Sequence, residues 1–206
     1  VSGRYNLPLL KECGGNTIRT YDTTHLASIL DEADSLGIAV VAGIWLPIAS
    51  EDWFYRNKEF IAQAEENLKR LGEKYKNHPA LLSWVLGNEL IFYDALDFSF
   101  PRQYAKLFRA LKQGDPNHPV GTAIANVGQK AMLNWSLKFR DLDYLLFNTF
   151  GRLKSLKSDL KYFTYYWDKP FFIGEFGEVG PWEAATTRWG VPLEMSSNNK
   201  AYWLRD

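Results

Sequence analysis

Short apolar runs alternate with longer amphipathic segments along the whole chain of 206 residues. Continuous apolar runs of this length are typical of strands covered on both faces, and amphipathic segments with a 3.6-residue repeat are typical of helices. The six predicted strands lie at 17–21, 38–45, 80–86, 120–125, 144–148 and 170–173. Predicted helices lie before Gly14, from Thr23 or Thr24 to Gly37, at 57–75, 102–112, 130–139 and 154–167, and from 201.

Strands that alternate with helices predict right-handed β-α-β units and a parallel sheet, which either closes into a barrel or stays open and doubly wound. The side chains at or just past the carboxyl ends of six different strands favour the barrel, because a barrel collects such side chains around one mouth. These side chains are Arg19, Trp45, Asn88, Glu89, Asn126, Asn148 and Glu175. The first strands are followed by no Gly-x-Gly-x-x-Gly, so a dinucleotide-binding sheet loses its usual support. We therefore predict an α/β fold of the TIM-type (β/α)8 class.

The predicted barrel is incomplete. A (β/α)8 barrel usually needs about 250 residues, whereas the six strands here match only the second to the seventh strand. Residues 1–206 form a single predicted domain, which we expect to be a fragment of a longer polypeptide. The strands near Ile18 and Phe172 would be unpaired apolar edges, so we expect the chain alone to aggregate or to turn over substrate poorly.

Composition narrows the classes of function. Lys plus Arg and Asp plus Glu total 24 each, and this balance argues against a nucleic-acid binder, which normally carries a basic excess. Aromatic residues make up 16% of the chain, which suits a packed core and also a sugar-stacking cleft. The single Cys13 and three scattered histidines show no metal-ligand spacing, so we expect no metal. The apolar runs are too short to span a bilayer.

Two of the acidic residues, Glu89 and Glu175, directly follow predicted buried strands. A carboxylate at that place projects into the mouth of a barrel, and the nearby Gly87 and Gly174 leave room for a ligand. Two glutamates that face each other across a cleft supply the acid and the nucleophile of a retaining glycoside hydrolase, with carboxyl groups about 5–5.5 Å apart. The alternative is that each carboxylate only caps the helix that follows its strand.

Three short motifs around these residues resemble motifs of the clan A glycoside hydrolases. Residues 87–89, Gly-Asn-Glu, resemble the acid/base motif on the fourth strand of that clan. Residues 174–177, Gly-Glu-Phe-Gly, resemble its seventh-strand nucleophile motif, and residues 16–19, Asn-Thr-Ile-Arg, resemble the second-strand segment whose arginine supports the nucleophile. Together with residues 75–81 and 143–148, they follow the order and spacing of the barrel domains of family 2 β-glycosidases and of β-1,3-glucanosyltransferases.

The resemblance implies a role for each matching residue. Glu89 would be the general acid/base, and Glu175 would be the nucleophile, held by Arg19 and forming a covalent glycosyl-enzyme. Asn88 would hydrogen-bond the 2-hydroxyl of the sugar. One position departs from the clan, whose sixth strand commonly ends Asn-x-Tyr: Phe150 stands here in place of the tyrosine whose hydroxyl donates to the nucleophile. The resemblance implies no metal or organic cofactor and favours a secreted or cell-envelope protein.

Further residues are candidates for sugar binding, with packing as the alternative for the aromatic ones. They are Tyr21, Trp45, Tyr93, Asn126, Asn148 and Trp182. The predicted function is that of a retaining β-glycoside hydrolase or transglycosylase that acts on a β-linked glucan or a related polysaccharide. The alternatives are a family 2-like exo-β-glycosidase of the galactosidase, mannosidase or glucuronidase type, and a carbohydrate-binding barrel without catalysis. The expected partner is a carbohydrate substrate, with no nucleic acid and no membrane span in this chain.

Overall fold

The computed structural model of the chain describes residues 6–50, 52–90, 99–125, 136–151, 156–177 and 184–205. Strands alternate with helices in the order that the sequence predicts. The strands are β1 (Thr17–Arg19), β2 (Ala39–Ile44), β3 (Leu81–Asn88), β4 (Val120–Ala125), β5 (Tyr144–Phe150) and β6 (Phe171–Gly177). The helices are α1 (Leu7–Glu12), α2 (Leu26–Leu36), α3 (Asp52–Tyr55), α4 (Lys58–Tyr75), α5 (Ser99–Gly114), α7 (Leu156–Tyr166) and α8 (Ser197–Arg205).

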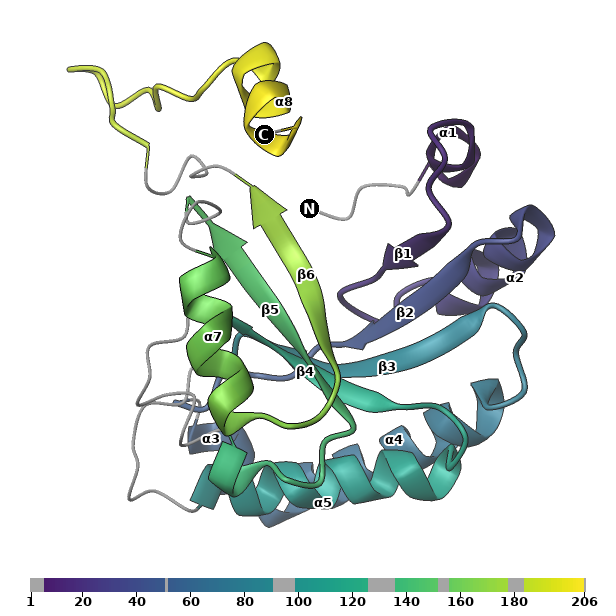
Figure 1. Cartoon of the computed structure of the whole chain (residues 1–206). Coiled ribbons are helices and arrows are strands. Elements are labelled where there is room, and N and C mark those ends of the chain that lie inside the picture. Colours follow the sequence, from purple (N-terminus) through teal and green to yellow (C-terminus); the bar gives the residue numbers. More distant parts are fainter. Residues whose placement is uncertain are drawn as a thin grey trace.

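The strands form one parallel sheet in chain order, β1-β2-β3-β4-β5-β6. Figure 1 shows that the sheet is strongly twisted, so that β5 and β6 run steeply across the direction of β2 and β3. Among the described residues β1 and β6 are edge strands, each paired on one side only. A doubly wound sheet would reverse its strand order at a switch point, whereas a TIM-type barrel keeps it. The predicted α/β class and the six-stranded part of a TIM-type barrel are therefore confirmed.

Apolar side chains cover both faces of the sheet. The larger cluster lies between the outer face of the sheet and the helices, and its buried members include Val40, Trp84, Leu107 and Phe163. The smaller cluster lies on the opposite face, inside the curve of the sheet, and consists of Val41, Val85, Ala123, Tyr144 and Leu146. Burial on both faces explains why the strands appear in the sequence as continuous apolar runs and not as alternating patterns.

Some predicted boundaries are wrong. The first strand ends at Arg19, two residues earlier than predicted, because the Asp22 carboxylate accepts a hydrogen bond from the Thr24 backbone N–H (2.7 Å) and turns the chain. Helix α2 then begins at Leu26 with His25 as its N-cap residue, so the predicted threonine cap is wrong. The sequence pattern misses α3, since a helix of one turn shows no repeat. Most of the helix predicted at 130–139 lies outside the described residues.

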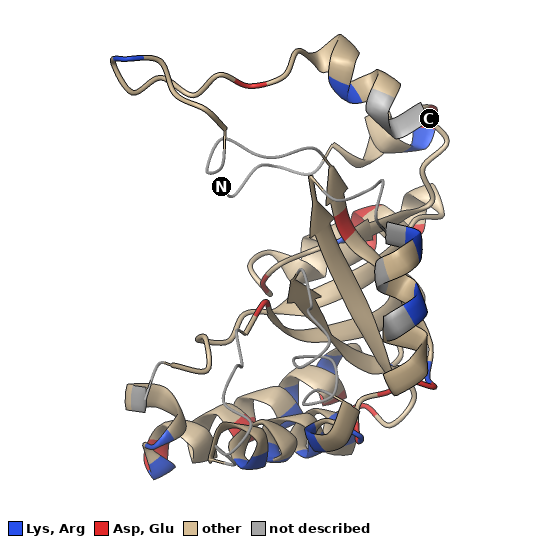
Figure 2. Cartoon of the chain, turned by 60° about the vertical axis from the view of Figure 1, so that its left-hand side comes forward, with Lys and Arg blue, Asp and Glu red and all other residues tan. Residues whose placement is uncertain are grey.

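Helices α4 and α5 pack side by side against the outer face of the sheet (Figure 1). Their closest approach requires glycine, because a Cβ at Gly114 would lie 2.1 Å from the Lys69 carbonyl oxygen. Charged residues gather on the helices, and few lie on the strands (Figure 2). None of the helices in the described ranges combines the length and the apolar character needed to cross a membrane.

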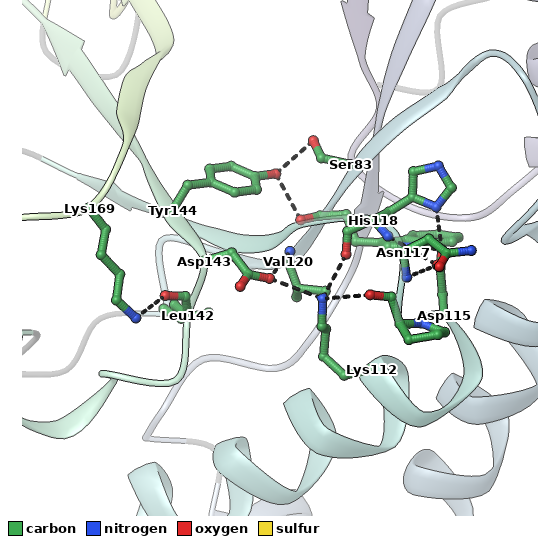
Figure 3. A network of polar contacts seen from close by, with 12 residues as sticks. Ser83, Lys112, Asp115, Asn117, His118, Val120, Leu142, Asp143, Tyr144 and Lys169 are labelled. Atoms are coloured by element: carbon green, nitrogen blue, oxygen red, sulfur yellow. Dashed lines mark hydrogen bonds and ion pairs between the residues drawn. The ribbon is translucent and has the colours of Figure 1, made fainter.

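A buried polar network joins the helix layer to the sheet near the amino-terminal ends of β4 and β5 (Figure 3). Asp115, just after α5, is fully buried, and its Oδ2 accepts a hydrogen bond from the Trp84 indole N–H (2.8 Å) and lies 2.7 Å from His118 Nδ1. Its Oδ1 accepts the backbone N–H groups of Asn117 and His118 at 3.0 and 3.1 Å. Burial raises the pKa of the Asp115 carboxyl, but the hydrogen bonds from Trp84 and His118 outweigh burial and hold this pKa below its ordinary value of 3.8.

Candidate active site

Five polar side chains meet at the carboxyl ends of the strands. They are Arg19 from β1, Asn88 and Glu89 from the end of β3, Asn148 from β5 and Glu175 from β6. The Arg19 guanidinium donates through Nη1 to Glu175 Oε1 at 2.9 Å and through Nη2 to Asn88 Oδ1 at 2.6 Å. The ion pair is well shielded, since 11% of the Arg19 side chain and 19% of the Glu175 side chain are exposed. Because these two residues lie on the two edge strands, the ion pair links the first strand of the sheet to the last.

Asn148 lies at the centre of this group and is 1% exposed. Its side-chain nitrogen lies 2.8 Å from Glu89 Oε1 and 2.8 Å from Glu175 Oε1. Two oxygens that share one nitrogen at this distance are at most about 5.6 Å apart, twice 2.8 Å. The same nitrogen lies 3.4 Å from Asn88 Oδ1, and the Asn148 carbonyl oxygen lies 3.5 Å from Arg19 Nη1. The structure therefore brings together both predicted catalytic glutamates, both supporting residues and one predicted sugar-binding residue.

A β-bulge turns Glu175 toward the other four side chains. Ile173 pairs with the residue before Asn148, whereas Asn148 itself pairs with Glu175, so Gly174 is an extra residue on β6. Ile173 packs against the helix-side cluster, and strand residues alternate between faces, so without the bulge Glu175 would face the helices as well. A Cβ at position 174 would lie 2.8 Å from Leu146 Cβ and 2.9 Å from Asn148 Oδ1. Gly174 thus makes room for side chains of β5, not for the ligand that the sequence suggests.

A second bulge precedes Glu89. The stretch from Val85 to Asn88 on β3 pairs with a stretch of β4 that is one residue shorter. Gly87 lies in this stretch with a φ of +80°, where a side chain would be strained. Glu89 follows with a φ of 49°, and its backbone N–H donates to the Ala123 carbonyl at 2.9 Å. This left-handed conformation costs a non-glycine residue about 1–2 kcal/mol, which is a form of backbone strain typical of functional sites.

Two of the remaining sugar-binding candidates lie at the same end of the sheet. Tyr21 follows β1 and is 42% exposed, and the Arg19 guanidinium lies over its ring, 4.9 Å from the centroid. Trp45 follows β2 and is 61% exposed, so that most of its surface is open for stacking. The other three candidates, Tyr93, Asn126 and Trp182, lie outside the described residues.

Phe150 leaves Glu175 without the tyrosine donor of the clan. Within the described part of the chain the side-chain donors to Glu175 are Arg19 and Asn148, and no tyrosine hydroxyl replaces the missing one. The sequence places Asn148 among the sugar-binding residues and gives no sign of this contact. The described residues also contain no group of three or more His, Cys, Asp or Glu side chains that could hold a metal ion.

The chemistry open to this group follows from the two close carboxyl groups and the arginine. One carboxyl group can give a proton to a leaving atom while the other attacks the carbon on the opposite side of the breaking bond. The ionised form of a carboxyl group is the form that attacks, and the Arg19 guanidinium lies 2.9 Å from Glu175 Oε1.

Comparison with known sequences finds a family model that covers most of the chain. The model, described as the TIM barrel domain of glycosyl hydrolases family 2, matches residues 5–181. A β-glucuronidase from Paenibacillus borealis is 29% identical over 122 residues, which make up 54% of this chain and 20% of that protein.

Solved β-glucuronidase structures share the fold. The match to the enzyme of Dictyoglomus thermophilum has a TM-score of 0.69 at 18% identity, and the match to that of an uncultured Clostridium species has 0.69 at 20%. The enzyme of Ruminococcus gnavus in complex with D-glucuronic acid gives 0.70 at 16% identity. These matches cover 96–97% of this chain and 34–36% of the solved chains, so the chain spans about a third of their length.

Proposed function

The chain belongs to the TIM barrel domains of glycosyl hydrolases family 2, and we propose that it forms the catalytic barrel of a retaining exo-β-glycosidase. This is the family 2-like alternative of the sequence analysis, and the comparisons support it better than the glucan hydrolase or transglycosylase that was the main expectation. The relatives described above are β-glucuronidases, so β-D-glucuronides are the proposed substrates.

One observation carries the proposal: the Asn148 amide holds an oxygen of Glu89 and an oxygen of Glu175 within about 5.6 Å of each other. Retaining glycosidases keep their carboxyl groups about 5–5.5 Å apart, whereas inverting enzymes need about 6.5–9.5 Å to admit a water molecule. The separation supports a retaining reaction. The short separation also argues against a barrel that only binds sugars. Two carboxylates this close repel each other, and sugar binding alone does not require such an unfavourable pair.

The reaction proceeds in two displacements. In the first, Glu175 forms a bond to the anomeric carbon while the bond to the leaving oxygen breaks, and Glu89 gives its proton to that oxygen. In the second, Glu89 takes a proton from water as the water oxygen bonds to the anomeric carbon, and the bond to Glu175 breaks. Arg19 stabilises the departing Glu175 carboxylate through the 2.9 Å ion pair.

The test uses the polypeptide in which this chain is naturally produced. We expect it to release 4-nitrophenol from 4-nitrophenyl β-D-glucuronide faster than from the β-galactoside, β-mannoside and β-glucoside. Proton NMR should show the β-anomer of the free sugar first, because two inversions retain the configuration. Appearance of the α-anomer first would contradict the retaining reaction. If none of the four compounds is turned over, the proposed glycosidase activity is wrong.

Substitutions assign the two roles. Glu175→Ala should abolish turnover, and added azide should restore part of it with formation of the α-glycosyl azide. Glu89→Gln should slow substrates with poor leaving groups far more than 4-nitrophenyl glycosides, because only a poor leaving group needs the proton. Glu66→Gln is the matched control, since Glu66 pairs with Arg70 on the exposed surface of α4 and should leave turnover unchanged. The opposite pattern for Glu89 and Glu175 would exchange their roles.

A further inference from the structure

The Asn148 amide group uses both of its hydrogens on the two glutamates. A side-chain amide nitrogen carries two N–H bonds, and the two short contacts of Asn148 Nδ2 are those to Glu89 Oε1 and Glu175 Oε1, each 2.8 Å. At 1% exposure the amide has almost no access to solvent, so the glutamates are its main partners.

The surroundings of Asn148 fix the orientation of the amide. Its carbonyl oxygen lies on the side of Arg19 Nη1, 3.5 Å away. The reverse orientation would place that oxygen against Glu89 Oε1 and Glu175 Oε1, which are acceptors when ionised, so that three acceptor oxygens would face one another. Hydrogen bonding therefore supports the orientation in which the nitrogen faces both carboxylates.

The contacts distinguish the two oxygens of each carboxylate. Glu175 Oε1 accepts hydrogen bonds from both Arg19 and Asn148, and Glu89 Oε1 accepts one from Asn148. Within the described part of the chain, the Oε2 atom of either glutamate accepts no hydrogen bond. As far as the described residues go, each glutamate thus has one oxygen hydrogen-bonded to the protein and one oxygen without a protein partner, which we assign to the ligand.

We propose that Asn148 is a positioning residue: it binds Oε1 of each glutamate and so leaves Oε2 of each to react with the substrate. This inference deepens the proposed function and rests on it. The N–H group at Glu89 Oε1 keeps the proton off that oxygen, so the proton sits on Oε2 and passes to the leaving oxygen as the glycosidic bond breaks. Glu175 attacks the anomeric carbon through Oε2, because its Oε1 stays bound to Arg19 and Asn148. Asn148 also supplies to Glu175 the neutral donor that Phe150 cannot supply.

The first test is kinetic and uses Asn148→Leu, which keeps the side-chain size and removes both N–H groups. We expect kcat for 4-nitrophenyl β-D-glucuronide to fall about 100-fold, as for loss of one donor to a reacting group, with KM within about twofold of wild type. A raised KM with unchanged kcat would show that Asn148 binds the sugar instead and would overturn the proposal.

Thr149→Val is the matched control for this variant. Thr149 is the next residue of β5, it is also fully buried, and its hydroxyl has no hydrogen-bond partner in the described part of the chain. Its replacement by an isosteric side chain should leave kcat and KM within about twofold of wild type. An equal loss in both variants would trace the effect to repacking of β5 and would overturn the role of the amide.

The second test does not depend on turnover. Asn148→Leu is combined with Glu89→Gln and, separately, with Glu175→Gln, and the urea midpoint of unfolding is measured for each single and double variant. If one amide holds both carboxyl groups, each double variant should lose less than the sum of its two single losses. Additive losses in either pair would overturn the bridge while the proposed function stands. Absence of wild-type turnover would overturn the proposed function and, with it, the catalytic part of this proposal.

Discussion

Replacing the buried Asp115 by asparagine is expected to destabilise the protein far more than its small change in shape suggests. The Asp115 carboxylate accepts four hydrogen bonds, one from Trp84, one from Asn117 and two from His118 (Figure 3). An amide has only one oxygen, so its NH2 group must face donors. In one orientation the NH2 faces the Trp84 indole N–H, and in the other it faces the two backbone N–H groups.

The magnitude follows from the donors that lose their acceptor. A buried donor without an acceptor costs about 1–3 kcal/mol, and loss of the carboxylate charge weakens the hydrogen bonds that remain. For Asp115→Asn we therefore expect a loss of about 3 kcal/mol in the free energy of unfolding at pH 7. This is a large fraction of the about 5–15 kcal/mol that holds a typical domain folded.

The pH dependence of the free energy of unfolding independently tests whether the Asp115 carboxylate stabilises the fold. The pKa of Asp115 is held below its ordinary 3.8 in the folded state, chiefly because the bonds from Trp84 and His118 outweigh burial. The carboxylate therefore stabilises the fold fully above the ordinary value and loses this contribution as the pH falls through the folded-state pKa. The difference between wild type and Asp115→Asn should shrink at about pH 3 relative to pH 7.

Urea unfolding followed by tryptophan fluorescence measures both effects. The control is Asp141→Asn, because Asp141 forms an exposed ion pair with Arg109 at 3.5 Å and should change the free energy of unfolding by less than about 0.5 kcal/mol. The reasoning is refuted if Asp115→Asn costs no more than this control at pH 7. It is also refuted if the cost of Asp115→Asn is the same at both pH values.

Three other substitutions test the candidate site. Arg19→Met should lower kcat/KM for the β-glucuronide at least about 100-fold, because Glu175 loses its charged donor at 2.9 Å, and steady-state kinetics showing less than a tenfold loss would contradict this. Glu89→Gly should be about 1 kcal/mol more stable to urea than Glu89→Ala, since both lose the carboxylate and only alanine keeps a Cβ at a φ of 49°; equal midpoints would disprove the strain. Gly174→Ala should reduce kcat about tenfold or more, because its Cβ would lie 2.9 Å from Asn148 Oδ1, and a wild-type kcat would rule out the bulge as the feature that aims Glu175.

Most of the sheet is predictable from the sequence because its strands are buried on both faces. The run at 120–125 matches β4 (Val120–Ala125) residue for residue, and helix α4 begins after Asn57, whose side chain caps its first turn. The N-terminal boundary of α2 is not predictable in the same way. The turn at Asp22 places His25 at the cap position although two threonines with better capping propensity stand just before it.

The position of the site is predictable from the strand ends, but its geometry is not. A carboxylate after a buried apolar run, as at Glu175, indicates the mouth of a barrel. Whether that carboxylate faces the mouth or the helices depends on a bulge, and a bulge is a property of two paired strands, so the sequence of β6 alone does not show that Gly174 is an extra residue. The contact of Asn148 with Glu175 depends on this bulge and is not predictable from the sequence for the same reason.

The chain order of the strands also sets when the site can form during synthesis. Each strand from β2 to β6 pairs with the strand that precedes it in the chain. The sheet can therefore grow by one strand at a time as the chain is synthesised. The contact between Arg19 and Glu175 is different, because it joins residues 156 positions apart. A nascent chain that ends after β5 already holds Arg19, Glu89 and Asn148 but lacks Glu175, the proposed nucleophile. In the proposed reaction the attacking carboxylate comes from β6, so glycoside cleavage requires that β6 has emerged and paired with β5.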